Sequence, residues 1–237
     1  MQSVIECILK EKIIAIIRGV PKDKLLELAE TMYRGGIRLM ECTFDASGKT
    51  TEEETAASIE MLVKHFEGRM LIGAGTVLNK KQVQLTKAAG GKFIISPDTN
   101  EEIIQETKKA GLISIPGAMT ASEATSAHRA GADFVKLFPV TSLGAGYIKA
   151  LRAPLSHIRF LAVGGVKQDN MREFLQSGVC GFGIGINDED KKNISAGNFA
   201  AIEEKCRGWV SAIQYKLMFL QGTERNPSRS FLQSHFA

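Results

Sequence analysis

The stretch Asp133-Phe134-Val135-Lys136-Leu137-Phe138-Pro139 has the length and composition of a buried β-strand, apart from its single lysine. An amphipathic helical pattern at 121–130 precedes it and ends at Ala130-Gly131. Glycine is typical of a helix end, because it adopts the left-handed conformation that closes a helix without steric cost. The stretch therefore belongs to a helix–strand unit, the repeating element of α/β proteins.

The same unit repeats along most of the chain. Short apolar runs rich in β-branched residues alternate with longer amphipathic segments, and this alternation indicates buried strands and covering helices. Eight strand–helix units of roughly 20 to 25 residues predict a closed parallel (β/α)8 barrel, a TIM barrel of the α/β class. The predicted strands are 13–17, 39–43, 71–73, 93–96, 113–115, 134–138, 160–163 and 181–184; the predicted helices include 22–33, 52–66, 80–89, 101–110, 121–130 and 170–176.

An open, doubly wound sheet is the alternative fold. Such sheets usually have fewer strands and a GxGxxG turn after the first strand, whereas that turn here reads Arg18-Gly19-Val20-Pro21. We therefore expect a single barrel domain at 1–214, with an extra N-terminal helix at 3–11 that closes the barrel floor. The polar, turn-rich segment 215–237 leaves the pattern and is expected to be a tail of uncertain structure, either docked on a neighbour or else disordered or foreign to the fold.

Composition excludes several classes of function. The net charge is +4, and the basic residues are scattered among acidic ones without a block that nucleic acid would bind. The N-terminus lacks the features of a signal peptide, and no stretch approaches the roughly 18 apolar residues of a membrane helix. The four cysteines have no CxxC or metal-binding spacing. We therefore expect a cytoplasmic protein with reduced thiols and no membrane, nucleic-acid or metal partner.

Two charged residues interrupt apolar strands. Lys136 lies in the sixth predicted strand, and Glu41 lies within the second, Leu39-Met40-Glu41-Cys42-Thr43. Burial disfavours the charged form of either group, so it lowers the pKa of a lysine and raises that of a glutamate. A neutral lysine attacks ketones to form a Schiff base, and a glutamate with a raised pKa transfers protons. The alternative interpretations are a structural ion pair between the two residues and, for Lys136, a long side chain whose charged end reaches the barrel mouth.

Other candidate residues follow the predicted strands. Active sites of (β/α)8 barrels gather at the carboxyl ends of the strands, where the sequence places Arg18, Thr76, Pro97 and Phe138. Glycines lie at the ends of strands seven and eight, where many barrels bind a phosphate through backbone N–H groups. A phosphate site is therefore predicted there, with tight turns alone as the alternative, and its glycines are Gly164, Gly165 and Gly185.

The stretches Ile72-Gly73-Ala74-Gly75-Thr76-Val77-Leu78 and Val135-Lys136-Leu137-Phe138-Pro139 are the most distinctive of the chain. With them, the chain from about residue 13 to 210 resembles the 2-keto-3-deoxy-6-phosphogluconate / 4-hydroxy-2-oxoglutarate (KDPG/KHG) aldolases. The resemblance implies that Lys136 forms a Schiff base, that Glu41 shuttles protons, and that Thr76 helps to bind the carboxylate of pyruvate. It further implies a distal phosphate site at the glycines, a homotrimer, and catalysis without metal or cofactor. The stretches that carry it are Ile72-Gly73-Ala74-Gly75-Thr76-Val77-Leu78, Ile95-Ser96-Pro97, Ile115-Pro116-Gly117, Val135-Lys136-Leu137-Phe138-Pro139 and Ala162-Val163-Gly164-Gly165-Val166.

Some positions depart from the family pattern. Asp45 stands where some members carry an arginine, and it cannot bind a substrate carboxylate, so Arg18 is the better candidate for that role. Val163 replaces a threonine of many phosphogluconate-specific members and resembles the branch that acts on the galactonate epimer. Ile186 stands in place of a phosphate-binding serine, and the acidic run 187–190 that follows is expected to repel phosphate.

The sequence thus predicts a Schiff-base aldolase of the aldehyde-lyase class. Its substrate would be a 2-keto-3-deoxy sugar acid, phosphorylated or not, or 4-hydroxy-2-oxoglutarate. The products would be pyruvate and an aldehyde, either glyceraldehyde 3-phosphate or glyoxylate. Two alternatives stay open: a non-catalytic barrel that binds sugar acids, and another phosphate-binding barrel with isomerase or epimerase activity.

Overall fold

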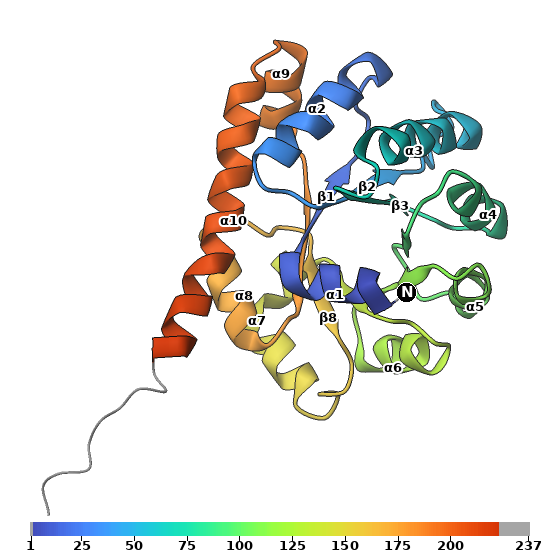
Figure 1. Ribbon diagram of the computed structural model, residues 1–237. Helices are drawn as coiled ribbons and strands as arrows, with labels where there is room; N and C mark the ends of the chain where they lie inside the picture. The colour runs from blue at the N-terminus through green and yellow to red at the C-terminus, as the bar shows by residue number, and fades with distance from the viewer. Residues whose placement is uncertain (1, 223–237) are drawn as a thin grey trace, which may run out of the picture.

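The computed structural model describes the backbone of residues 2–222 and the side chains of residues 3–214. Strands and helices alternate along the chain, and the helices surround the strands (Figure 1). The strands are β1 (Ile13–Ile17), β2 (Leu39–Thr43), β3 (Leu71–Gly75), β4 (Phe93–Ile95), β5 (Ile113–Ile115), β6 (Gly117–Ala118), β7 (Val135–Leu137), β8 (Phe160–Val163) and β9 (Gly181–Gly185). The helices are α1 (Gln2–Glu11), α2 (Lys22–Arg34), α3 (Glu52–Phe66), α4 (Lys80–Ala88), α5 (Glu101–Lys109), α6 (Ala121–Arg129), α7 (Val140–Arg152), α8 (Met171–Ser177), α9 (Asp188–Ser195) and α10 (Phe199–Gly222).

The strands form one parallel sheet in the order β5-β4-β3-β2-β1-β9-β8-β7-β6. The two outer strands of that order, β5 and β6, follow each other in the chain and are separated by Pro116 alone. Proline has no N–H to donate, so the ladder is interrupted there, but the Lys136 N–H donates to the Pro116 carbonyl and joins β7 to this strand. The sheet is therefore a nearly closed barrel, and the predicted (β/α)8 fold is confirmed with its fifth strand in two parts.

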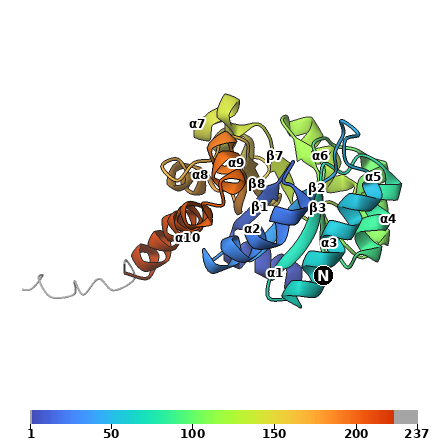
Figure 2. The ribbon, with the colours of Figure 1, turned by 90° about the horizontal axis from the view of Figure 1, so that it is seen from above.

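Two apolar cores hold the barrel together. One lies between the strands and the surrounding helices, and the other fills the barrel interior near its amino-terminal end. Helix α1 lies across that end (Figures 1 and 2), where its fully buried Ile8 packs on Ile14, Leu39 and Phe93. The extra N-terminal helix expected at 3–11 is therefore confirmed as α1.

Helix α10 packs along the outside of the barrel beside α2 (Figure 1). Arg34 of α2 donates to Glu203 of α10 at 2.9 Å, and Cys206 and Trp209 of α10 are buried. The backbone of 215–222, the first part of the predicted tail, continues this helix, and 223–237 lie outside the described residues. The side chains of 215–237, including the aromatic ones expected to dock, are likewise outside the described part. Within 2–222, no helix is long and apolar enough to cross a membrane.

Candidate active site

Strand periodicity directs the two predicted catalytic side chains into the barrel. Successive side chains of a strand point to opposite faces, so residues two apart share a face. Leu39 and Phe134 belong to the core of the barrel interior. Glu41 and Lys136 follow them by two positions, on β2 and β7. Both charged side chains therefore point inward, one layer closer to the carboxyl ends of the strands.

A cavity of about 760 Å³ opens at the carboxyl ends of the strands. Its lining draws on the ends of strands β1, β2, β7, β8 and β9 and on the loops that follow strands. The structure brings together all of the site residues predicted from the sequence, and none lies elsewhere. Those that line the cavity are Arg18, Glu41, Thr76, Pro97, Lys136, Phe138, Gly164, Gly165 and Gly185.

Glu41 is buried in a space that a glycine leaves free. Its side chain is 2% exposed, and no hydrogen-bond partner reaches its Oε2 among the described residues. A Cβ at Gly75 would lie 2.2 Å from Oε1, so any larger residue there would displace the Glu41 carboxyl group. Burial raises the pKa of Glu41 to about 7, although the positive charges of Lys136 and Arg18 oppose the rise. The carboxyl group can therefore both give and accept a proton near neutral pH.

Lys136 lies at the cavity wall and is 8% exposed. Burial lowers its pKa; the charge of Glu41 opposes this shift and that of Arg18 adds to it. Its Nζ lies 4.6 Å from the ring centroid of Phe138, which partly covers it. Within 2–222, Lys136 forms no ion pair with a carboxylate. No ion pair therefore joins Lys136 to Glu41 among the described side chains, although their charges interact, and the amine is available to a ligand in the cavity.

Arg18 and Thr76 lie together at the rim. The Arg18 Nη2 donates to the Thr76 Oγ1 at 3.0 Å. Thr76 has φ +56°, a left-handed conformation that is unusual for a β-branched residue and that concentrates at functional sites. The guanidinium keeps further donors free, and two parallel N–H groups match a carboxylate. The pair can therefore hold the carboxylate of a keto acid beside the amine. Pro97 is exposed at the same rim.

Asp45 does not line this cavity. Its carboxylate accepts hydrogen bonds from the backbone N–H groups of Ser47, Lys49 and Thr50 and from the Ser47 hydroxyl. The hydrogen bonds from Ser47, Lys49 and Thr50 lower its pKa, with the Ser47 side chain the largest cause. Asp45 therefore orders the loop after β2, which is a structural task.

The glycine turn after β8 is closely packed. Gly164 and Gly165 have φ +83° and +79°, a region that favours glycine. A Cβ at Gly165 would lie 1.7 Å from the Thr141 side chain, so no larger residue fits. The Gly165 carbonyl accepts from the Asn170 side chain, which fixes the turn at the cavity rim. The geometry lets a ligand approach the backbone closely.

Residues 4–205 match the family described as KDPG and KHG aldolase. The chain belongs to that family. A 2-dehydro-3-deoxy-6-phosphogalactonate aldolase of Escherichia coli is 35% identical over 177 residues, which are 74% of this chain and 83% of that protein. A 2-dehydro-3-deoxy-phosphogluconate aldolase of Treponema pallidum is 30% identical over 206 residues, 85% of this chain and 93% of the relative. The KDPG aldolase of Legionella pneumophila, solved with pyruvate as a covalent carbinolamine intermediate, has a TM-score of 0.73 and 29% identity over 83% of this chain and 93% of its own.

The chain is therefore an aldolase, of the aldehyde-lyase class. Family membership favours this prediction over the non-catalytic sugar-acid-binding barrel and over an isomerase or epimerase. The Schiff-base chemistry predicted from the sequence agrees with the covalent pyruvate adduct of the Legionella relative.

Several residues at the distal end of the cavity are not predicted by the sequence. Lys205 and Trp209 reach it from α10, and Lys167 and Gln168 line it after β8. No local pattern marks the α10 residues, because the helix returns to the site from beyond the last strand.

The acidic run 187–190 is less repulsive toward an anion than expected. Asp190 is buried, accepts from the Asn187 N–H in the cap of α9, and pairs with Lys205 at 2.7 Å. Asp188 pairs with Lys191. Of the three carboxylates, Glu189 alone lines the cavity. The expectation that the whole run opposes phosphate is therefore too strong, because two carboxylates are neutralised locally.

Proposed function

We propose that this aldolase cleaves a 2-keto-4-hydroxy acid through a Schiff base on Lys136 and releases pyruvate and an aldehyde. The observation that carries the proposal is the pairing of two buried groups in one cavity with pKa shifts in opposite directions. Burial raises the pKa of Glu41 and lowers that of Lys136. Such shifts keep the amine uncharged more often and the carboxyl close to its titration midpoint, as a nucleophile and a proton carrier require.

The proposed reaction begins when the neutral Nζ of Lys136 attacks the C2 carbonyl of the substrate. Glu41, in its protonated form, gives its proton to the leaving hydroxyl, so the carbinolamine loses water and becomes a protonated imine. Glu41, as the carboxylate, takes the proton of the C4 hydroxyl, the C3–C4 bond breaks, and its electron pair moves into the imine to form an enamine. The aldehyde leaves, Glu41 returns the proton to C3, and water hydrolyses the imine to pyruvate and free lysine.

Reductive trapping tests the role of Lys136. Borohydride reduces the imine with pyruvate to a stable amine, so digestion and mass spectrometry should find the added mass on Lys136. Lys136→Ala should abolish it. Lys167→Ala is the matched control, because Lys167 lines the same cavity and should not be needed. An adduct that persists in Lys136→Ala, or that appears on Lys167 in the native chain, would contradict the assignment.

The second part of the proposal is that Arg18 and Thr76 bind the carboxylate of the keto acid. Their hydrogen bond and their position at the rim beside Lys136 support it. A charge-assisted hydrogen bond contributes about 1.5 to 3 kcal/mol, so Arg18→Met should raise the KM for the keto acid about 10- to 150-fold. The change in kcat should be smaller, because the reacting groups stay in place. An unchanged KM would refute this role.

The distal group of the substrate would lie near Gly164, Gly165 and Gly185, beside Ile186. Ile186 lacks the hydroxyl donor that a serine would provide there. Backbone N–H groups and the Lys167 ammonium could still bind an anionic distal group. We therefore expect phosphorylated and unphosphorylated 2-keto-3-deoxygluconate to differ by less than about a hundredfold in kcat/KM, the value of one charge-assisted contact. A larger preference for the phosphorylated substrate would require a further donor. Coupled lactate dehydrogenase assays measure both.

We also propose that the aldolase works as a homotrimer in the cytoplasm. The family resemblance supports the trimer, and the exposed apolar side chains of Leu78 and Met119 offer surface that a second copy would cover. Four free cysteines fit a reducing compartment. Sedimentation equilibrium should give three times the mass of the chain; a monomer or dimer would contradict the assembly. Recovery outside the cytoplasmic fraction of its native cells would contradict the location.

A further inference from the structure

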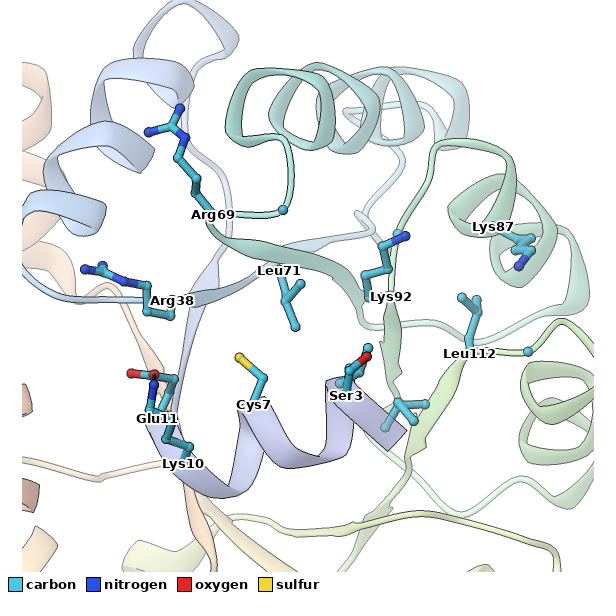
Figure 3. A pocket seen from close by; sticks show the side chains of 15 residues that line it. Ser3, Cys7, Lys10, Glu11, Arg38, Arg69, Leu71, Lys87, Lys92 and Leu112 are labelled. Atoms are coloured by element: carbon cyan, nitrogen blue, oxygen red, sulfur yellow. Dashed lines mark ion pairs between the residues drawn. The ribbon is translucent and has the colours of Figure 1, made fainter. Parts of the chain in front are cut away.

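A second cavity lies at the opposite end of the barrel. It measures about 620 Å³ and is formed by α1, by the first residues of β3 and β5, by the segments that precede β2, β3, β4 and β5, and by Lys87 of α4 (Figure 3). It shares no residue with the cavity around Lys136. Strand β3 runs between the two, with Leu71 at this cavity and Gly75 beside Glu41. Its ligand would therefore not compete with a keto acid.

Positive charge dominates the lining. The charged residues are Lys10, Arg38, Arg69, Lys87 and Lys92, with Glu11 as the sole acid among the lining residues. Glu11 pairs with Lys10 at 3.3 Å. Within the described part of the chain, the other four cations form no ion pair with a carboxylate. Like charges around one cavity repel each other and favour an anion between them.

The two arginines are held in place by the protein itself. Arg38 Nη1 donates to the carbonyls of Tyr33 and Ile37 at 2.8 Å, and its guanidinium stacks on the Tyr33 ring at 4.2 Å. Arg69 donates to the His65 carbonyl at 3.1 Å. A guanidinium has five N–H donors, so both groups keep donors free. Both side chains are therefore ordered before any ligand binds, and Figure 3 shows them directed away from the middle of the cavity, so they would meet an anion at its outer edge.

The floor of the cavity is apolar. The side chains of Cys7 and Leu71 point toward its middle, and the charged side chains stand around its edge (Figure 3). Val4, Leu112 and Ile113 complete the apolar lining. The cavity thus combines an apolar surface with a basic rim.

We propose that this cavity binds a small organic phosphate whose apolar body lies on the floor and whose dianionic group meets the basic rim. The volume lies within the roughly 300 to 1,000 Å³ of small-molecule sites, whereas an inorganic anion would fill only a small part of it. The four unpaired cations match a group with at least two negative charges. Binding at this cavity would not require the proposed roles of Lys136 and Glu41.

The rate at which iodoacetamide labels Cys7 reports whether a ligand occupies the cavity. Cys7 lines the cavity and is half-buried, and Cys180 is half-buried but does not line it, so Cys180 is an internal control. Iodoacetamide is uncharged, and mass spectrometry gives its labelling rate at each thiol. With phenyl phosphate at ten times its Kd, the rate at Cys7 should fall about elevenfold by mass action while that at Cys180 stays constant. Phenol, which lacks the charge, and inorganic phosphate, which lacks the apolar body, should protect less.

Charge reversal tests the rim. The double variant Lys87→Glu/Lys92→Glu should lose protection by phenyl phosphate and keep the native labelling rate at the half-buried Cys180, which reports that it is folded. Lys149→Glu/Lys192→Glu, at exposed lysines away from both cavities, should keep protection. An unchanged Cys7 rate in the native chain, equal protection by phenol, or full protection in Lys87→Glu/Lys92→Glu would each overturn the proposal.

Discussion

Replacing Glu41 with glutamine keeps the size of the side chain and removes its charge. A carboxyl group whose pKa is higher in the folded than in the unfolded chain binds its proton more tightly in the folded state. Its effect on stability is therefore most favourable at low pH, and it declines as the pH rises between the two pKa values. For Glu41 these are the ordinary value of 4.5 and about 7. As the pH rises across this window, the free energy of unfolding of the native chain should fall. Glu41→Gln has no carboxyl group at this position, so its free energy of unfolding should not show this fall.

The magnitude follows from the two pKa values. At about 1.4 kcal/mol per pKa unit, full ionisation of Glu41 costs the folded state roughly 3 kcal/mol, of which about 2 to 3 kcal/mol develops between pH 5 and pH 8. Glu41→Gln should thus gain about 2 to 3 kcal/mol over the native chain when the pH is raised. Loss of the Glu41 charge also lowers the pKa of Lys136 further, which adds in the same direction.

Urea denaturation at pH 5 and pH 8 measures this difference, at one protein concentration and with the buried Trp209 as the fluorescent reporter. Glu27→Gln, at an exposed position of α2, is the matched control and should follow the native chain. Glu41→Gln should also lower kcat for cleavage about 10²- to 10⁴-fold, the usual contribution of a general base. Equal changes in unfolding free energy for the native chain and Glu41→Gln between the two pH values would refute the buried, raised-pKa carboxyl.

Three further substitutions have defined outcomes. Gly75→Ala places a Cβ where Glu41 lies, so kcat should fall more than tenfold while pyruvate adducts still form; a kcat within twofold of native would contradict the packing argument. Ile186→Ser restores a donor at the distal end and should raise the kcat/KM ratio of phosphorylated to unphosphorylated substrate about tenfold, and an unchanged ratio would place the phosphate elsewhere. Lys205→Met leaves the buried Asp190 without its cation and should lower the free energy of unfolding in urea by about 2 kcal/mol. This loss is smaller than for a fully buried pair because Lys205 is about one-third exposed. An unchanged free energy of unfolding would mean that the ion pair does not stabilise the fold.

Much of the fold and of the predicted site followed from local patterns. Lys136 and Glu41 are conspicuous because each is the only charged residue in an apolar strand, and the two-residue period then directs both into the barrel. Arg18 and the glycines after β8 could be placed at the cavity because parallel strands of one barrel end at the same face.

The features that the sequence did not predict depend on contacts between distant segments. Lys205 returns from α10 to pair with Asp190, so the acidic run looked more repulsive than it is. The need for glycine at position 75 is visible only once Glu41 from the neighbouring strand lies against it. Likewise, the basic cavity gathers residues such as Lys10 and Lys92 that are far apart in sequence and give no local signal.

The central claim is that the Lys136 amine is uncharged more readily than an exposed lysine. Competitive labelling with trace acetic anhydride across a pH series reports the titration of each lysine, with the exposed Lys149 as the reference for reagent concentration. Because burial lowers the pKa of Lys136, its labelling should reach half of its maximum clearly below pH 10.5, the ordinary value for a lysine. A midpoint at or above pH 10.5 would contradict the mechanism.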